Sequence, residues 1–378
     1  MKYIKKYSYD EWLIIIAALT LFQPNYYVTY AMISVLSSFV LFRKKSREKI
    51  YAFKLYNYFI ALFPIFTLPA AMSQNWLGLM QGLCFWYGLT FVCCMFCTMT
   101  SEFYNKIIDL MLVLSIFSVI YAFVEMRFLG MDRASATFTH PNYYASAIEV
   151  FIFTAFYRYT KTKKKIYWLV ILANVCGLVM TNCRTAWLAL AAAVVFYVIY
   201  YLRNVRVFLG ITALVACAFA VIFIFMPRMD SGDLSDSTDV RLKIWQYAWV
   251  KISQNPMIGY GSMSFMDMAD EISYDFTPHA HNIIFNTLLD FGVVGFVAFI
   301  TMFGKYYRVL IRNSKYGAEY DRIMKLIMTL SVCFLAHGML DAILTMAHMY
   351  ILTFIILSGA FVERNERLNR KLPLRQIA

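Results

Sequence analysis

Residues 239–295 combine polar side chains and glycines within a chain that is otherwise strongly apolar. The stretch contains Arg241, a Gly259-Tyr260-Gly261 turn and the run His279-Ala280-His281-Asn282. Polar side chains are costly near hydrocarbon, so such a concentration predicts a functional site. Arg241 starts a predicted helix over 240–254, where its guanidinium offers two parallel donors to a phosphate. It could equally anchor the helix to lipid headgroups.

Two other interpretations of this stretch have less support from its context. The glycine pair resembles part of a nucleotide loop, but no strand precedes it, so close backbone approach at a tight turn is the better explanation. His279 and His281 could bind a metal ion, but neither a Glu-x-x-His motif nor a cysteine lies near them in the sequence. We therefore expect neither a metal nor another cofactor.

The composition of the whole chain indicates the environment in which residues 239–295 lie. Of 378 residues, 61% are hydrophobic, 18% are aromatic and only 15% are charged, which excludes an ordinary soluble domain. Backbone groups must be satisfied internally in lipid, so each long apolar run predicts a transmembrane helix. The expected fold is all-α, a polytopic transmembrane bundle of twelve helices. These cover residues 12–22, 26–42, 50–72, 77–100, 107–126, 143–159, 166–182, 185–202, 205–226, 283–303, 323–345 and 348–362.

Basic residues determine the predicted orientation, because loops rich in Lys and Arg tend to remain in the cytoplasm. With twelve spans, the clusters at 2–6, 43–49, 161–165, 203–206, 305–325 and 364–375 fall on one side. Both termini are then cytoplasmic, and residues 227–282 form one extracytoplasmic loop within a single membrane domain, 1–378. The net charge of +13 lies mainly along the inner face. We therefore expect membrane lipids as partners and no nucleic acid.

Four segments carry a pattern that is more specific in combination than any one of them alone. They are His281-Asn282 followed after nine residues by Gly292-Val293-Val294-Gly295; Arg241, Trp245, Asn255-Pro256 and Gly259-Tyr260-Gly261; Asn182-Cys183-Arg184-Thr185-Ala186-Trp187; and Thr137-Phe138-Thr139-His140-Pro141-Asn142. Over roughly residues 130–300 this pattern resembles the O-antigen ligase and polymerase family of bacterial membrane glycosyltransferases. Cys183 and His140 depart from it, since the family usually has Ser and Asn there.

The resemblance implies a GT-C-like fold and transfer of a glycan to an acceptor hydroxyl on the outer face of the bacterial cytoplasmic membrane. It also implies inversion at the anomeric carbon without a metal ion. His281 would act as base or position the acceptor, because the ordinary pKa of histidine lies near neutral pH. Arg184 and Arg241 would clamp the diphosphate of the donor. Further candidates for substrate binding are Arg133, Asn142, Gly259, Gly261, His279 and Asn282.

The implied donor is an undecaprenyl-diphosphate-linked glycan, while the acceptor remains open. A polymerase adds the glycan to another lipid-linked repeat, whereas a ligase attaches it to a different glycan or lipid-linked acceptor. We expect a surface-polysaccharide polymerase, because a second copy of the donor type is the smallest addition to one compact loop. A transporter or lipid-oligosaccharide flippase is the remaining alternative. In that case Glu149, Asp290, His337 and Asp341, which lie at membrane depth, could form an ion pathway.

Overall fold

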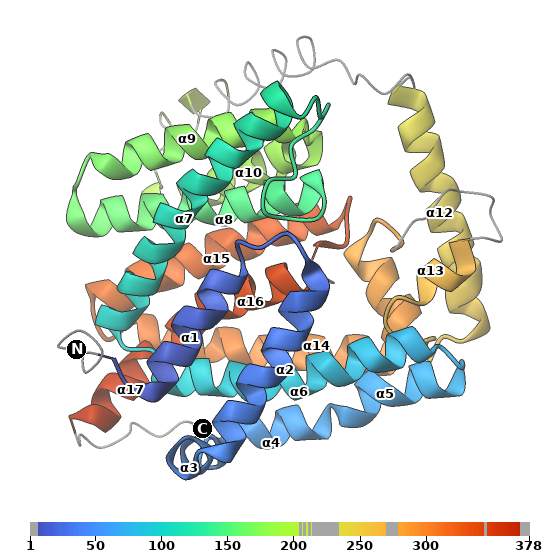
Figure 1. Cartoon of the computed structure of the whole chain (residues 1–378), viewed down its shortest axis with the longest axis horizontal. Coiled ribbons are helices and arrows are strands. Elements are labelled where there is room, and N and C mark those ends of the chain that lie inside the picture. The colour runs from blue at the N-terminus through green and yellow to red at the C-terminus, as the bar shows by residue number, and fades with distance from the viewer. Residues whose placement is uncertain are drawn as a thin grey trace.

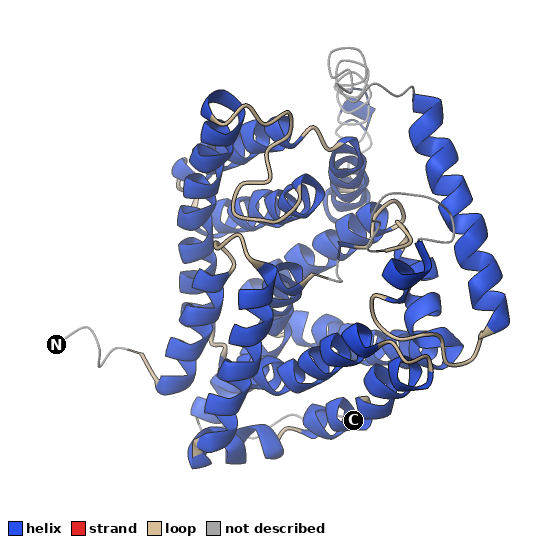
Figure 2. Ribbon diagram, turned by 45° about the vertical axis from the view of Figure 1, so that its right-hand side comes forward, coloured by secondary structure: helices blue, strands red, loops and turns tan. Residues whose placement is uncertain are grey.

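The structure is a computed structural model, and it describes residues 7–203, 206, 209–210, 213, 234–269, 279–343 and 346–370. Within these residues every regular element is a helix and none is a strand (Figure 1 and Figure 2). The prediction of an all-α fold is therefore confirmed. Most of the predicted helix 205–226, and parts of the loop 227–282, lie outside the described residues.

The first half of the chain forms helices that follow the apolar runs closely. They are α1 (Tyr9–Thr20), α2 (Tyr26–Phe42), α3 (Lys44–Tyr51), α4 (Lys54–Ala61), α5 (Phe63–Met72), α6 (Trp76–Thr98), α7 (Ser101–Phe128), α8 (Pro141–Thr162), α9 (Ile166–Thr181) and α10 (Arg184–Tyr197), which continues as the π-helix η2 (Val198–Leu202). Local sequence fixes several starts. Ser8, Asn25, Asn75 and Thr100 each accept a hydrogen bond from the first turn of the helix that follows.

The second half supplies the elements that carry most of the candidate site. They are α12 (Leu234–Gln254), α13 (Ser264–Ala269), α14 (Ile283–Ser314), α15 (Ala318–Gly338), α16 (Ala347–Leu357), the 3-10 helix η5 (Ser358–Phe361) and α17 (Val362–Asn369). Figure 1 shows α8, α9 and α10 stacked at one end of the molecule and α14, α6, α5 and α4 at the other, with α15 and α16 between them. The long helix α12 packs against α14 at the side.

Six helical segments among the described residues are long and apolar enough to cross a membrane. They are Lys54–Met72, Trp76–Thr98, Ser101–Phe128, Arg184–Leu202, Ile283–Ser314 and Ala347–Asn369. The pair α2 and α3, bent by 95°, counts as a seventh if it is one span. Large apolar side chains also lie exposed on α7, where Phe117 is 62% and Val113 57% accessible, as a lipid-facing helix requires. The chain is therefore of the multi-pass membrane type.

Several predicted boundaries are wrong. The run 50–72 is divided among α3, α4 and α5, α7 begins at Ser101 rather than 107, and α14 continues to Ser314 rather than ending at 303. The run 323–345 is predicted as one helix, but α15 ends at Gly338. After it, the N–H groups of Leu340 and Asp341 both donate to the His337 carbonyl at 3.0 Å. Asp341 therefore lies in a loop. The predicted helix 240–254 does end at Gln254, but it begins six residues earlier, at Leu234. The polar run before Val240 is thus part of the helix.

A break inside α14 connects the glycine turn to the membrane helices. Gly292 has φ 60° and ψ −169°, which only glycine adopts readily. A Cβ there would lie 2.3 Å from the Met257 carbonyl oxygen, and one on Gly259 would lie 2.6 Å from that of Leu289. Both contacts are impossible for a larger residue. Close backbone approach at Gly259 is thus confirmed as the structural reason for this turn.

Four backbone hydrogen bonds hold this turn and the helix break together. The N–H groups of Tyr260 and Gly261 donate to the carbonyls of Leu289 and Asp290 at 2.8 and 2.7 Å, and those of Val293 and Val294 donate to Pro256 and Met257 at 2.9 and 3.1 Å. The carbonyls left free by the break thus find donors in the turn. The segment that follows α12 is therefore held against α14, the helix that begins two residues after His281.

Candidate functional site

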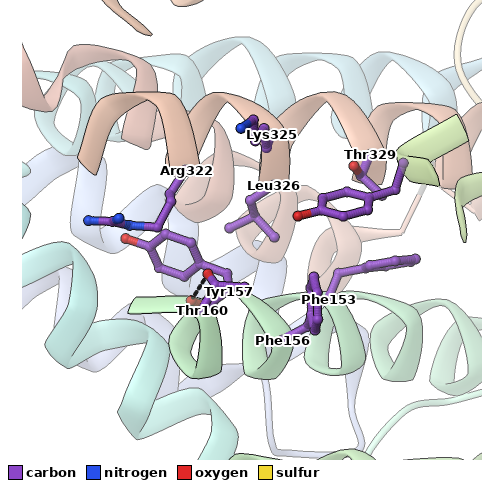
Figure 3. Close-up of a pocket in the computed structure, with 9 residues that line it drawn as sticks. Phe153, Phe156, Tyr157, Thr160, Arg322, Lys325, Leu326 and Thr329 are labelled. Carbon is purple, nitrogen blue, oxygen red and sulfur yellow. Dashed lines mark hydrogen bonds between the residues drawn. The ribbon is translucent and has the colours of Figure 1, made fainter. Parts of the chain in front are cut away.

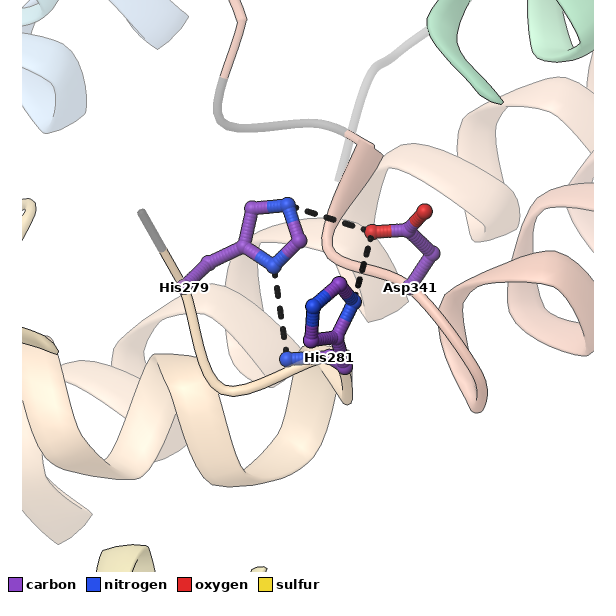
Figure 4. A group of neighbouring side chains, drawn as sticks. All are labelled: His279, His281 and Asp341. Carbon is purple, nitrogen blue, oxygen red and sulfur yellow. Dashed lines mark hydrogen bonds and ion pairs between the residues drawn. The ribbon is translucent and has the colours of Figure 1, made fainter. Parts of the chain in front are cut away.

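Three polar side chains from distant parts of the sequence meet at the start of α14. Nε2 of His279 lies 3.2 Å from Oδ1 of Asp341, and Nδ1 of His281 lies 3.6 Å from the same oxygen (Figure 4). The side chains of His279 and Asp341 are almost completely buried, whereas that of His281 is 26% exposed. His281 is therefore the member of this cluster that a substrate can reach.

The backbone turns sharply at His281. Its φ is +46°, a left-handed conformation that is uncommon for residues other than glycine. The next residue, Asn282, caps α14 by accepting from the N–H groups of Ile284 and Phe285 at 2.9 and 3.2 Å. Its amide also donates to the Met339 carbonyl at 3.0 Å. Asn282 thus ties the start of α14 to the loop that holds Asp341, next to His281.

The hydrogen bonds of His279 define its role. Its Nδ1 accepts from the His281 N–H at 3.3 Å, so Nε2 carries the ring proton and faces both Asp341 and the hydroxyl of Tyr143, the latter at 3.1 Å. Burial lowers the pKa of His279 to about 4. At neutral pH it is therefore an uncharged donor that orients Asp341.

Asp341 is the charged centre of the cluster. Burial alone would raise its pKa, but the facing imidazoles of His279 and His281 outweigh burial and hold the pKa well below its ordinary value. The carboxylate also accepts from the side chain of Asn142 at 2.6 Å and from the Ala342 N–H at 2.8 Å. Hydrogen bonds of this kind favour the ionised form. A fixed negative charge thus lies beside the Nδ1 of His281.

Asn142 extends the cluster to the loop before α8. The Arg133 guanidinium donates to the Asn142 side-chain oxygen at 2.8 Å and to the Thr181 carbonyl at 3.0 Å. His140 caps α8 by accepting from the Asn142 N–H at 3.1 Å. This bond explains how His can stand where the family pattern has Asn. Arg133, Asn142, His279 and His281, predicted as site residues, are thus brought together.

The two other predicted arginines lie on neighbouring elements. Arg184 is the first residue of α10, directly after the end of α9 to which Arg133 is bound through Thr181. Arg241 lies on α12, which packs against α14. Both side chains are half-buried. Gly259 and Gly261 contribute their close backbone contacts with α14 and α5 rather than side chains.

The sequence did not identify Asp341 as part of this cluster. It was grouped with Glu149, Asp290 and His337 in a possible ion pathway, because acids in apolar segments are conspicuous. The described contacts place these residues in three different groups. Glu149 lies 2.7 Å from Nδ1 of His337, and Asp290 accepts from Ser264 and Asn286 at 2.9 and 2.7 Å. Only Asp341 contacts the two histidines.

The same three side chains could hold a metal ion. Each of His279, His281 and Asp341 offers one ligand atom, and these atoms lie within 4.8 Å of one another. Two imidazoles and a carboxylate are a known ligand set for zinc. The sequence near the histidines offers no third ligand, whereas the fold brings one from residue 341. Hydrogen bonds account for the side chains of His279 and Asp341 without an ion. Nδ1 of His281 is buried, has no hydrogen-bond partner among the described residues and lies 3.6 Å from Asp341.

These features define an all-helical membrane protein with a histidine and carboxylate site at the ends of its helices. Residues 168–300 match the family model described as O-antigen ligase. This match supports the O-antigen ligase and polymerase family, and the resemblance inferred from the motifs is confirmed. The family consists of glycosyltransferase-like membrane enzymes of polysaccharide biosynthesis, which use lipid-linked glycans. A search of curated proteins gave no match. His281 lies within the matched segment, whereas Asn142 and Asp341 lie outside it.

Proposed function

We propose that this protein transfers a glycan from undecaprenyl diphosphate to an acceptor hydroxyl, as a surface-polysaccharide polymerase. The observation that carries this proposal is the pairing of the accessible His281 with the buried carboxylate of Asp341. A histidine held in this way by a carboxylate is a general base whose orientation and conjugate acid are both stabilised. The family match over residues 168–300 supplies the substrate class.

The reaction is a single displacement. The acceptor oxygen attacks the anomeric carbon while the bond from that carbon to the diphosphate oxygen breaks, so the configuration inverts. The proton of the hydroxyl passes to Nε2 of His281, and the charge of Asp341 beside Nδ1 stabilises the imidazolium that forms. No step requires a metal ion, because Arg184 and Arg241 would stabilise the leaving diphosphate by paired hydrogen bonds. Arg133 and Asn142 would hold Asp341 in position.

The proposed setting is a single membrane domain, 1–378, with twelve transmembrane helices and a GT-C-like arrangement in a bacterial cytoplasmic membrane. Both termini are cytoplasmic, and the loop 227–282, with His279, His281 and Asn282, faces outside. The distribution of Lys and Arg supports this orientation. The lipid-linked donor would reach the site from the outer leaflet.

A ligase that attaches the glycan to a different acceptor is the second candidate, since the matching family is described by that activity. Purified protein should be supplied with undecaprenyl-diphosphate-linked repeat units alone and the products separated on a gel. A ladder of lengthened products identifies a polymerase. If products form only when a different acceptor is added, the protein is a ligase. Movement of the lipid-linked glycan between leaflets without any transfer would contradict both.

A further inference from the structure

A cavity lies between α8, α10 and α15, at the end of the α8 and α15 pair that is remote from Asp341. Aromatic rings form much of its wall, namely Phe153, Phe156 and Tyr157 of α8 and Tyr197 of α10. Figure 3 shows Arg322 on α15 beside the α8 side chains, with Lys325 about one turn further along α15. The cavity thus combines an apolar wall with two cations, and the proposed transfer site uses none of these residues.

Both cations contact carboxylates of their own helix, and Lys325 also lies 5.4 Å from the centroid of the Tyr201 ring. Lys325 pairs with Asp321 at 2.8 Å and Arg322 with Glu319 at 3.2 Å, each along the same helix and with the cation about a third exposed. Pairs of this type between partly exposed side chains contribute little to stability. An anion that binds Arg322 and Lys325 more strongly could therefore replace the carboxylates of Glu319 and Asp321 with little loss of free energy.

Arg322 also has spare hydrogen-bonding capacity. Its partner Glu319 already binds the ammonium of Lys161 and accepts from Tyr157 at 3.0 Å and Asn105 at 3.1 Å. The buried Nε of Arg322 has no hydrogen-bond partner among the described residues. A buried donor of this kind favours an incoming acceptor. Glu319 shares its charge between Lys161, at Oε1, and Arg322, at Oε2.

The surrounding chain indicates what kind of anion fits. Basic residues gather at this end of both helices, in the segments 161–165 and 305–325. Basic pockets between transmembrane helices bind anionic lipid headgroups. A free phosphate would engage the cations but would leave the aromatic wall exposed. An acyl chain would cover that wall and bury apolar area.

We propose that this cavity binds an anionic phospholipid, with its phosphate at Arg322 and Lys325 and an acyl chain against Phe156 and Tyr197. The test compares the unfolding temperature of the detergent-purified full chain in added phosphatidylglycerol and in added phosphatidylcholine. Native mass spectrometry of the same samples counts retained lipid. The variant is Arg322→Gln with Lys325→Gln, and the matched control is Lys305→Gln with Arg308→Gln. The control removes two exposed cations at the same spacing from α14.

Phosphatidylglycerol should raise the unfolding temperature of the wild type and the control by roughly 3 °C or more beyond phosphatidylcholine, since a ligand stabilises the state that binds it. The Arg322 and Lys325 variant should lose this difference and the retained lipid. Phe156→Gln, which keeps both cations, should also reduce the difference in unfolding temperature between the two lipids. This variant provides the test if the double variant does not fold. Equal stabilisation of all variants, or the same shift with inorganic phosphate alone, would overturn the proposal.

Discussion

The side-chain amide of Asn142 donates a 2.6 Å hydrogen bond to the carboxylate of Asp341, across 199 residues of sequence. This bond joins the start of α8 to the loop after α15. Two turns further along α8, Glu149 contacts His337 of α15 at 2.7 Å. The same two helices are thus joined twice, and the position of Asp341 beside His281 follows from how they pack.

Replacing Asp341 with Asn should abolish most transfer, because the amide keeps the shape but removes the charge that stabilises protonated His281. We expect the turnover rate to fall roughly 100-fold or more. Asp290→Asn is the matched control, since Asp290 is an equally buried carboxylate with hydrogen bonds to Ser264 and Asn286 rather than to a histidine. A similar loss of turnover in both variants would indicate general destabilisation.

Lysine at Arg184 or Arg241 should lower transfer roughly tenfold to a hundredfold, because a single ammonium cannot make the paired contacts that a guanidinium makes with a diphosphate. Arg308→Lys, at an exposed position of α14, provides the control. Initial rates at several donor concentrations measure the effect. Near-normal rates in both lysine variants would mean that these arginines only anchor the protein to lipid headgroups.

Gly292→Ala should destabilise the protein by more than about 2 kcal/mol, because its Cβ would overlap the Met257 carbonyl and its φ of 60° is strained for alanine. Gly304→Ala on the same helix should be neutral or slightly stabilising, since a Cβ there meets nothing within 4 Å. Thermal unfolding in detergent compares the two. Equal stability of both variants would show that the turn at Gly259 does not pack against the helix break.

The stability of the site should depend on pH through His279. Burial lowers its pKa from 6.5 to about 4, so between these values the unfolded chain binds a proton that the folded chain does not. The contribution of neutral His279 to the free energy of unfolding is fully present above pH 6.5. It falls by about 3 kcal/mol as the pH is lowered to 4. Unfolding temperatures of the wild type and of His279→Asn across this range measure the effect. An identical pH dependence in the two proteins would contradict the assignment.

A chelator should leave transfer unchanged to within about twofold, although His279, His281 and Asp341 are close enough to hold an ion. The reason is that the proposed reaction takes its electrophilic assistance from arginines. Elemental analysis of the purified protein provides a second measurement. A stoichiometric metal, with activity that is lost on chelation and restored by zinc, would require a different mechanism.

The sequence predicted the all-helical class, because helix formation in long apolar runs depends on local sequence. Of the twelve predicted spans, six described segments are long and apolar enough to cross a membrane, or seven with the bent pair α2 and α3. The sequence also predicted the close backbone approach at Gly259, because glycine lacks a Cβ and allows two backbone segments to approach closely at a turn. It did not predict the break at Gly292 or the loop after Gly338, since both lie inside apolar runs and depend on contacts with Met257 and with Asn282. The partner of His281 was missed for the same reason. Asp341 lies sixty residues further along the chain, and only packing brings the two together.

If His281 removes the proton of the acceptor, its loss should impair transfer but not donor binding. Wild type and His281→Ala should be compared for binding of the undecaprenyl-diphosphate-linked repeat and for single-turnover transfer at saturating donor. We predict that the variant binds the donor with an affinity within about threefold of the wild type, while its transfer rate falls roughly 100-fold or more. Transfer by His281→Ala at close to the wild-type rate would contradict the claim.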